Sequence, residues 1–108
     1  MKQKPVVPRA IARQDIERAI DYYLEQQAGK AALGLIDALQ HAYSHIGRHP
    51  EAGSSRYAHE LDLPGLRSWP LKRYPYLVFY VEQSGHIDIW RVLHSMNDLP
   101  AWLRSDPA

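Results

Sequence analysis

The 108-residue sequence contains no cysteine, and this absence excludes several kinds of chemistry. Disulfide bonds, a nucleophilic thiolate and zinc sites built on sulfur all require that residue. The sequence also lacks any run of about 20 apolar residues, the length that a membrane-spanning helix needs. No apolar stretch follows Met1–Pro5, so we expect neither a signal peptide nor a membrane anchor. These absences are typical of a cytoplasmic protein.

An excess of positive charge is missing as well. Thirteen Lys and Arg residues stand against 12 Asp and Glu residues, which gives a net charge of +1. Proteins that bind DNA or RNA directly usually have a larger basic excess. Any contact with nucleic acid would therefore have to come from a local cluster of cations.

Two stretches carry apolar residues every three or four positions, which is the spacing of an α-helix. Gly29 predicts the break between the two helices, and His49 with Pro50 predicts the end of the second. Because only a few residues separate the helices, we expect an antiparallel helical hairpin. The apolar faces consist of Ala12, Ile16, Ala19, Ile20, Tyr23 and Leu24 in the first helix and Ala32, Leu35, Ile36, Leu39, Ala42, Tyr43 and Ile46 in the second.

The rest of the sequence favours strands, with Pro70 near an edge of the sheet and turn residues between the last two strands. The predicted segments are strands at Val6–Val7, Leu66–Arg73, Tyr76–Val81 and Ile87–Leu93, and a short helix or turn at Asn97–Leu103. The fold class is therefore α+β, in the order β-α-α-β-β-β. We expect the helical hairpin to pack on a mostly antiparallel sheet, with a short C-terminal helix.

The last two predicted strands are apolar on both faces. Alternation places Leu77, Phe79 and Val81 opposite Tyr76, Val78 and Tyr80, and Ile87, Ile89 and Leu93 opposite Trp90 and Val92. Two helices can cover only one face of such a sheet, and a monomer normally avoids exposing the other. We favour a partner protein as the cover of the second face. The alternative is that the loop Glu51–Pro64 folds over it.

Several short segments occur in a distinctive order along nearly the whole chain. They are Pro8-Arg9-Ala10, Asp15-Ile16, His49-Pro50-Glu51-Ala52-Gly53, Gly65-Leu66-Arg67, Tyr74–Tyr80, Arg91–His94 and Asp98-Leu99-Pro100. With this ordered set, the sequence resembles the RelE/ParE toxin superfamily, and most closely its ParE branch. The resemblance implies a single toxin domain over residues 1–108.

The resemblance also implies a partner and a target. The partner is a ParD-like antitoxin encoded beside the toxin, whose C-terminal tail wraps the toxin in a hetero-oligomeric complex, and DNA is contacted only through this antitoxin. ParE-like toxins act on DNA gyrase, whereas RelE-like toxins cut messenger RNA on the ribosome. We favour a gyrase inhibitor without catalysis of its own. The alternative is a ribosome-dependent ribonuclease, and a third possibility is a binding module that has lost toxicity.

A polar cluster on the predicted sheet is the candidate target-binding site. It consists of Arg67, Lys72, Arg73, Arg91 and His94. A ribonuclease needs an acid, a base and cations for the phosphate, and Arg67, Arg91 and His94 are the candidates for these roles. However, the three-residue spacing puts Arg91 and His94 on opposite faces of an ideal strand. The segment after His94 also has no Lys or Arg before Arg104, in contrast to RelE-type nucleases.

A purely structural role is the alternative for two residues of this cluster. In that case Arg91 pairs with a carboxylate such as Asp88, Asp98 or Glu82, and His94 caps or packs. Such a role needs no target and no chemistry.

Aromatic residues on the predicted sheet are candidates for contact with the antitoxin, because Tyr and Trp are enriched at the centres of protein interfaces. They could also stack on bases, but the near-neutral net charge favours a protein. The predicted antitoxin-binding residues are Tyr76, Tyr80 and Trp90 on the sheet and Leu35 and Leu39 on the hairpin.

Three histidines, His41, His45 and His49, repeat every four positions and therefore share one face of the second helix. A pair of histidines at this spacing can bind zinc, but a further ligand is needed and no acidic residue completes a known motif. Solvated surface is the simpler interpretation. The sequence also lacks a glycine-rich phosphate loop, so we predict neither a metal site nor a cofactor.

Overall fold

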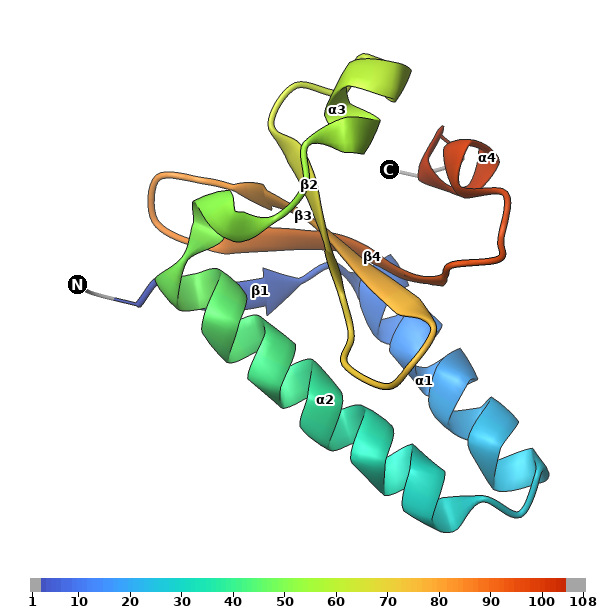
Figure 1. Ribbon diagram of the computed structural model, residues 1–108. Helices are drawn as coiled ribbons and strands as arrows, with labels where there is room; N and C mark the ends of the chain where they lie inside the picture. Colours follow the sequence, from blue (N-terminus) through green and yellow to red (C-terminus); the bar gives the residue numbers. More distant parts are fainter. Residues whose placement is uncertain (1–2, 105–108) are drawn as a thin grey trace.

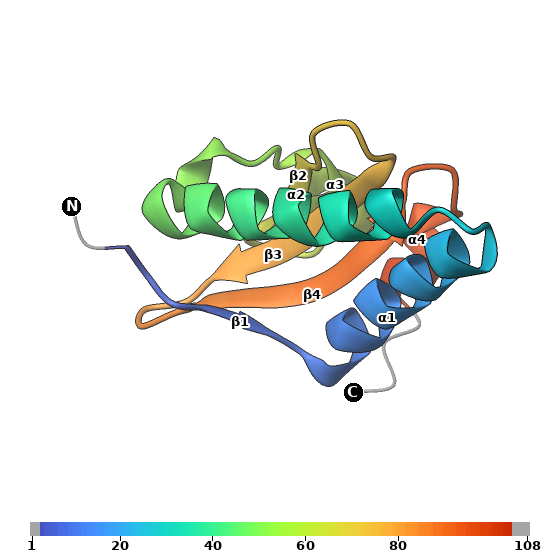
Figure 2. The ribbon, with the colours of Figure 1, turned by 90° about the horizontal axis from the view of Figure 1, so that it is seen from below.

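The computed structural model describes residues 3–104 of the chain. The elements are β1 (Val6–Pro8), α1 (Ala10–Glu25), α2 (Gly29–Arg48), the 3-10 helix η1 (Pro50–Ala52), α3 (Arg56–Leu61), β2 (Leu66–Pro70), β3 (Tyr76–Glu82), β4 (Ile87–His94) and α4 (Leu99–Arg104). Helices α1 and α2 form a hairpin on one side of the sheet, and α3 and α4 lie on the other side (Figures 1 and 2). The predicted α+β class and element order are confirmed, while η1 and α3 were not foreseen.

The helical hairpin packs through its predicted apolar faces, with two exceptions near its tip. Ala12 and Ala19 of α1 and the inward residues of α2 are buried against the sheet. Leu24 and Ile36, by contrast, are 53% and 38% exposed, so their assignment to the core was wrong. Leu24 follows Tyr23, which packs on the core, and each step along a helix rotates the side chain by about 100°.

The sheet has the strand order β1-β4-β3-β2, with β1 parallel to β4 and the other pairs antiparallel. Strand β2 therefore lies at an edge and ends at Pro70, as expected for a residue that cannot donate a ladder hydrogen bond. The predicted strand was three residues too long, because the chain after Pro70 turns back and the Leu71 amide donates to the Tyr76 carbonyl (3.0 Å).

Strand β4 contains a β-bulge that changes which side chains share a face. Phe79 pairs with Arg91, while the next residue, Tyr80, pairs with Ile89, so Trp90 is an extra residue in β4. A bulge shifts the alternation of side chains by one position. Val92 consequently joins Ile87 and Ile89 under the helices, and Leu93 faces the other way. The expectation that Leu93 shares a face with Ile87 was wrong for this reason.

The second face of the sheet is covered by the chain itself. Phe79 and Leu93 form a second core with Leu61 of α3 and with Leu99 and Leu103 of α4. The alternative of a cover formed by residues 51–64 is therefore correct, and α4 completes it. The partner protein that we favoured is not needed to bury this face. None of the described helices is long and apolar enough to cross a membrane.

Candidate functional site

A buried ion pair accounts for Arg91. Its Nη2 and Nε donate to the two carboxylate oxygens of Asp15 at 2.7 and 2.8 Å, and both side chains are nearly inaccessible to solvent. The Arg91 Nη1 also donates to the carbonyl of Trp102 (3.1 Å), and the Val92 amide donates to Asp15 (3.0 Å). This network ties α1, β4 and α4 together. Arg91 is therefore not a surface residue, which corrects its assignment to target binding or to phosphate binding.

The sequence contained a sign that Asp15 is buried. Asp15 is three residues after Ala12 and four before Ala19, so it lies on the apolar face of α1. A carboxylate at such a position needs a buried partner. The expected partners of Arg91 were Asp88, Asp98 and Glu82, all of which are closer to it in sequence than Asp15.

Asp88 binds a different arginine and shapes the surroundings of Trp90. The Arg9 guanidinium donates to Asp88 at 3.0 and 3.1 Å, and its Cζ lies 4.7 Å from the centre of the Trp90 ring. The indole nitrogen of Trp90 donates to Asp88 as well (3.2 Å). Trp90 is therefore held in place but stays partly exposed, as a residue that contacts a partner must be.

Arg67 and Tyr80 both hold the segment around η1. Arg67 donates to the carbonyls of Glu51 and Gly53 at 3.1 and 2.8 Å. The Tyr80 hydroxyl donates to the Pro50 carbonyl (2.7 Å) and accepts from the Gly53 amide (3.0 Å). Burial raises the pKa of this hydroxyl above its ordinary value. Arg67 is partly exposed. Its hydrogen bonds hold the η1 segment in place, whether or not it also contacts a target.

Three of the five predicted antitoxin-binding residues belong to the core. Tyr80 is fully buried. Leu35 and Leu39, on the inner face of α2, are 1% and 5% exposed. Their burial removes them from the surface of the chain, so we no longer assign them to partner binding. Tyr76 and Trp90 remain partly exposed.

His94 ends β4 beside a cleft of about 240 Å³ that is also lined by Tyr76, Arg18 and Trp102. The His94 ring meets the Tyr76 ring edge to face, with centres 5.2 Å apart. Its Nδ1 lies 3.1 Å from the Met96 amide and accepts that hydrogen bond. A neutral imidazole that accepts at Nδ1 carries its proton on Nε2, so Nε2 is available to donate a hydrogen bond.

The structure separates the three residues considered for a ribonuclease. Arg91 is bound to Asp15 inside the protein, while His94 lines the cleft beside α1. Arg67 lines a different cavity, next to α3. A general base and the cations that neutralise a phosphate must meet at one reacting group. These residues do not share a cleft in which that could happen.

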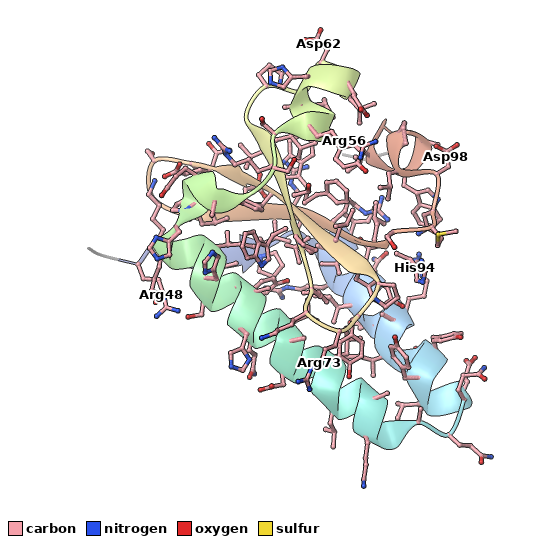
Figure 3. The ribbon with its side chains drawn as sticks, viewed as in Figure 1. Arg48, Arg56, Asp62, Arg73, His94 and Asp98 are labelled. Carbon is pink, nitrogen blue, oxygen red and sulfur yellow. The ribbon has the colours of Figure 1, made fainter. Side chains whose placement is uncertain are left out.

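Lys72 and Arg73 lie in the turn between β2 and β3, where both are exposed. This turn and His94 are at the same end of the sheet, because Tyr76 pairs with His94, whereas Arg67 pairs with Tyr80 further along. Figure 3 shows Arg73 above α2 and His94 beyond the end of β4. The predicted cluster thus divides into Lys72 with Arg73, His94 near its own cleft, and two residues that hold the fold.

The three histidines occupy different environments, two of them in α2 and His49 directly after its end. His41 is exposed and lies 3.5 Å from the carboxylate of Asp37. The ring of His45 stacks on Trp69 with centres 4.4 Å apart, and His49 lies tilted against His45. Within residues 3–104, no three His, Cys, Asp or Glu residues are grouped to hold a metal ion. His45 is a packing residue of this surface.

Comparison with known proteins places the chain in a family. The sequence profile of the family described as "ParE toxin of type II toxin-antitoxin system, parDE" matches residues 6–99. The chain belongs to the ParE toxin family. A solved structure, described as the chromosomal ParDE toxin–antitoxin system from P. aeruginosa, has the same fold as this ParE-family chain. The TM-score is 0.70 at 18% sequence identity, over 85% of this chain and 96% of that one. No curated protein matches the sequence.

Membership of the ParE family confirms the resemblance that the ordered sequence segments indicated. The segments from Pro8 to Leu99 lie within the matched region. Several of these residues maintain the fold: Arg9 binds Asp88, Asp15 binds Arg91, and Gly53 meets Tyr80. The family resemblance therefore rests in large part on residues that hold the ParE fold together.

Proposed function

We propose that this ParE-family chain inhibits DNA gyrase by binding it, in the cytoplasm, and is neutralised by a ParD-like antitoxin in a hetero-oligomeric complex. The observation that carries the proposal is the placement of the polar residues. Arg91, the one buried cation of the predicted cluster among the described residues, is bound to Asp15, and the His94 ring accepts a hydrogen bond from the Met96 amide, away from Arg91. A toxin that acts by binding needs none of these groups as an acid or a base.

The tip of the helical hairpin supports a protein partner. Four large apolar side chains are exposed there, on the last turns of α1 and the first turns of α2. They are Tyr22 (53% exposed), Leu24 (53%), Leu33 (70%) and Ile36 (38%). Exposed apolar side chains of this size are typical of interaction sites. We assign them to the antitoxin in place of the buried Leu35 and Leu39, together with Tyr76 and Trp90.

A gyrase supercoiling assay with the purified chain tests this proposal. We expect increasing amounts of the chain to inhibit supercoiling, and we expect the purified ParD-like antitoxin to restore it. An interface of about 1,000 Å² or more is expected between toxin and antitoxin, as in other stable complexes. If the chain leaves gyrase active and instead cleaves messenger RNA on purified ribosomes, the ribonuclease alternative replaces this proposal.

A further inference from the structure

A groove opens between α2 and the turn that connects β2 to β3. Its volume is about 730 Å³. One wall comes from α2 and the other from the turn, with small and apolar residues between them. The residues that matter for the argument are Asp37, Ala38 and His45 on the helix, Trp69 near the end of β2, and Lys72 and Arg73 on the turn.

The groove is preformed, because the turn is anchored to the helix. The Tyr74 hydroxyl donates to the Ala31 carbonyl of α2 (2.8 Å), and the Tyr74 ring meets the edge of Tyr23 at 5.8 Å. Gly34 allows this contact, because a Cβ at that position would collide with the Tyr74 hydroxyl. A partner that enters such a groove does not have to order the turn first, which favours binding.

The groove presents cations that the chain does not neutralise. Within residues 3–104, neither Lys72 nor Arg73 forms an ion pair with a carboxylate, although both are exposed. Arg73 adopts a left-handed backbone conformation (φ 71°) that non-glycine residues other than Asn and Asp rarely take. Among the described residues that line the groove, Asp37 is the one carboxylate, and it lies beside His41.

We propose that this groove binds an acidic, extended segment of the protein that the toxin inhibits. Carboxylates of the segment would meet Lys72 and Arg73, and an apolar side chain would enter over Ala38 and Leu71 between the two walls. Arginine pairs well with carboxylates because its planar fork can donate two hydrogen bonds at once. The inference rests on the proposed function, since a toxin that acts by binding must present a surface to its target.

A protein segment fits the groove better than a nucleic acid does. One face of Trp69 is already covered by His45, with ring centres 4.4 Å apart, so that face offers no stacking platform for a base. Tight phosphate binding usually needs more cations than Lys72 and Arg73 supply. Small and apolar residues such as Ala38 and Leu71 suit an aliphatic side chain.

The test compares two variants that remove the same charge. Lys72→Gln with Arg73→Asn neutralises the groove, and Asn suits the left-handed backbone at position 73. Arg13→Gln with Lys30→Gln removes two exposed cations elsewhere, one from α1 and one from α2. Circular dichroism and thermal melts establish that both variants are folded. Each protein is then titrated against a short fluorescent peptide that alternates Glu and Leu, and against gyrase in the supercoiling assay.

We expect the groove variant to bind the Glu-Leu peptide about tenfold more weakly than the parent, with a similar loss of potency against gyrase. The control variant should match the parent in both assays. Equal peptide binding by both variants overturns the inference, as does tighter binding of the parent to a short oligothymidylate than to the peptide. A groove variant that inhibits gyrase as well as the parent also overturns it while leaving the proposed function intact. A parent that binds the peptide but does not inhibit gyrase refutes the proposed function instead.

Discussion

At the scale of single residues, the pair formed by Asp15 and Arg91 has the greatest structural consequence. Both charges are buried, and each is satisfied by the other and by backbone groups of β4 and α4. Charges removed from water are tolerated only when they are paired and hydrogen bonded. One pair therefore connects three elements that are far apart in the sequence.

Replacing Arg91 by Ala should cost about 3–5 kcal/mol of unfolding free energy, because Asp15 would remain buried without its partner. Urea denaturation followed by circular dichroism measures this change. The double variant Asp15→Ala, Arg91→Ala should lose less than the sum of the two single variants, since it leaves no charge unpaired. Strictly additive losses would mean that the two side chains act independently.

Tyr43 of α2 offers a test of a buried hydroxyl. Within the described residues its hydroxyl is buried and forms no hydrogen bond, and burial raises its pKa from 10.0 to about 12. Between these two pH values the unfolded chain has lost the Tyr43 proton while the folded chain keeps it. The folded state therefore binds more protons, and stability falls as the pH rises through this range.

Tyr43→Phe should accordingly stabilise the protein by up to about 1 kcal/mol near neutral pH, because an unpaired buried hydroxyl is removed. It should also lose less stability than the parent between pH 10 and 12. Thermal melts across this pH range compare the two proteins. A variant that is clearly less stable at pH 7 would show that the hydroxyl has a favourable partner.

At the scale of elements, helical periodicity predicts burial well in the middle of the hairpin and less well near its tip. Leu39 and Ile46 are buried as their spacing predicts, whereas Leu24 and Ile36 face outward. The pattern identifies which stripe of a helix is apolar. It does not reveal where the sheet beneath the helix ends, and a helix side chain beyond that boundary has nothing to pack against.

Leu39→Ala should destabilise the fold by about 2–5 kcal/mol, because it opens a cavity between α2 and the sheet. Ile36→Ala on the same helix is the matched control and should cost less than about 1 kcal/mol, since Ile36 is partly exposed. Chemical denaturation of both variants provides the comparison. Similar losses at the two positions would mean that the helix is rotated from the orientation described.

The β-bulge at Trp90 is a second limit of pattern-based prediction at this scale. Strict alternation assigned Leu93 to the same face as Ile87, and one extra residue reversed that assignment. The bulge has no local sequence marker such as glycine at this position. It becomes visible only in the pairing with β3, where Phe79 pairs with Arg91 and Tyr80 with Ile89.

At the scale of the whole molecule, the arrangement of the polar residues favours binding over catalysis. The residues of the predicted cluster lie in four different places. Arg91 is in a buried ion pair, Arg67 holds the η1 segment, His94 ends β4, and Lys72 and Arg73 lie on an exposed turn. Each part has its own surroundings, and the exposed turn with Lys72 and Arg73 lines the groove beside α2.

His94→Gln should leave the toxicity of the chain unchanged if the toxin acts by binding. Glutamine keeps a polar side chain but removes the imidazole that a nuclease could use as a general base. A ribonuclease that lost its general base would be slowed by about 10²–10⁴-fold and would become harmless at ordinary expression. Growth curves of bacteria expressing each protein provide the measurement, with circular dichroism as the check on folding. A folded but harmless variant, together with message cleavage by the parent, would establish the ribonuclease.

The sequence by itself determined the element types, their order, the apolar stripe of each helix and the two-sided strands, and it was enough to indicate the family. These features depend on local spacing and on the order of short segments, which are visible along one chain. Lys72 and Arg73 were predicted to bind the target and Tyr76 and Trp90 to bind the antitoxin, and all four keep side-chain surface that is accessible to solvent.

Only the tertiary structure decided which polar residues are exposed to a partner and which are buried and paired inside the protein. Asp15 and Arg91 are 76 positions apart, and their local sequences do not indicate that they pair with each other. The same holds for Tyr80 with Pro50 and for α4 with the second face of the sheet, because each contact depends on how the strands are ordered. Burial and pairing are properties of surroundings that distant segments create, so they appear only when the chain is folded.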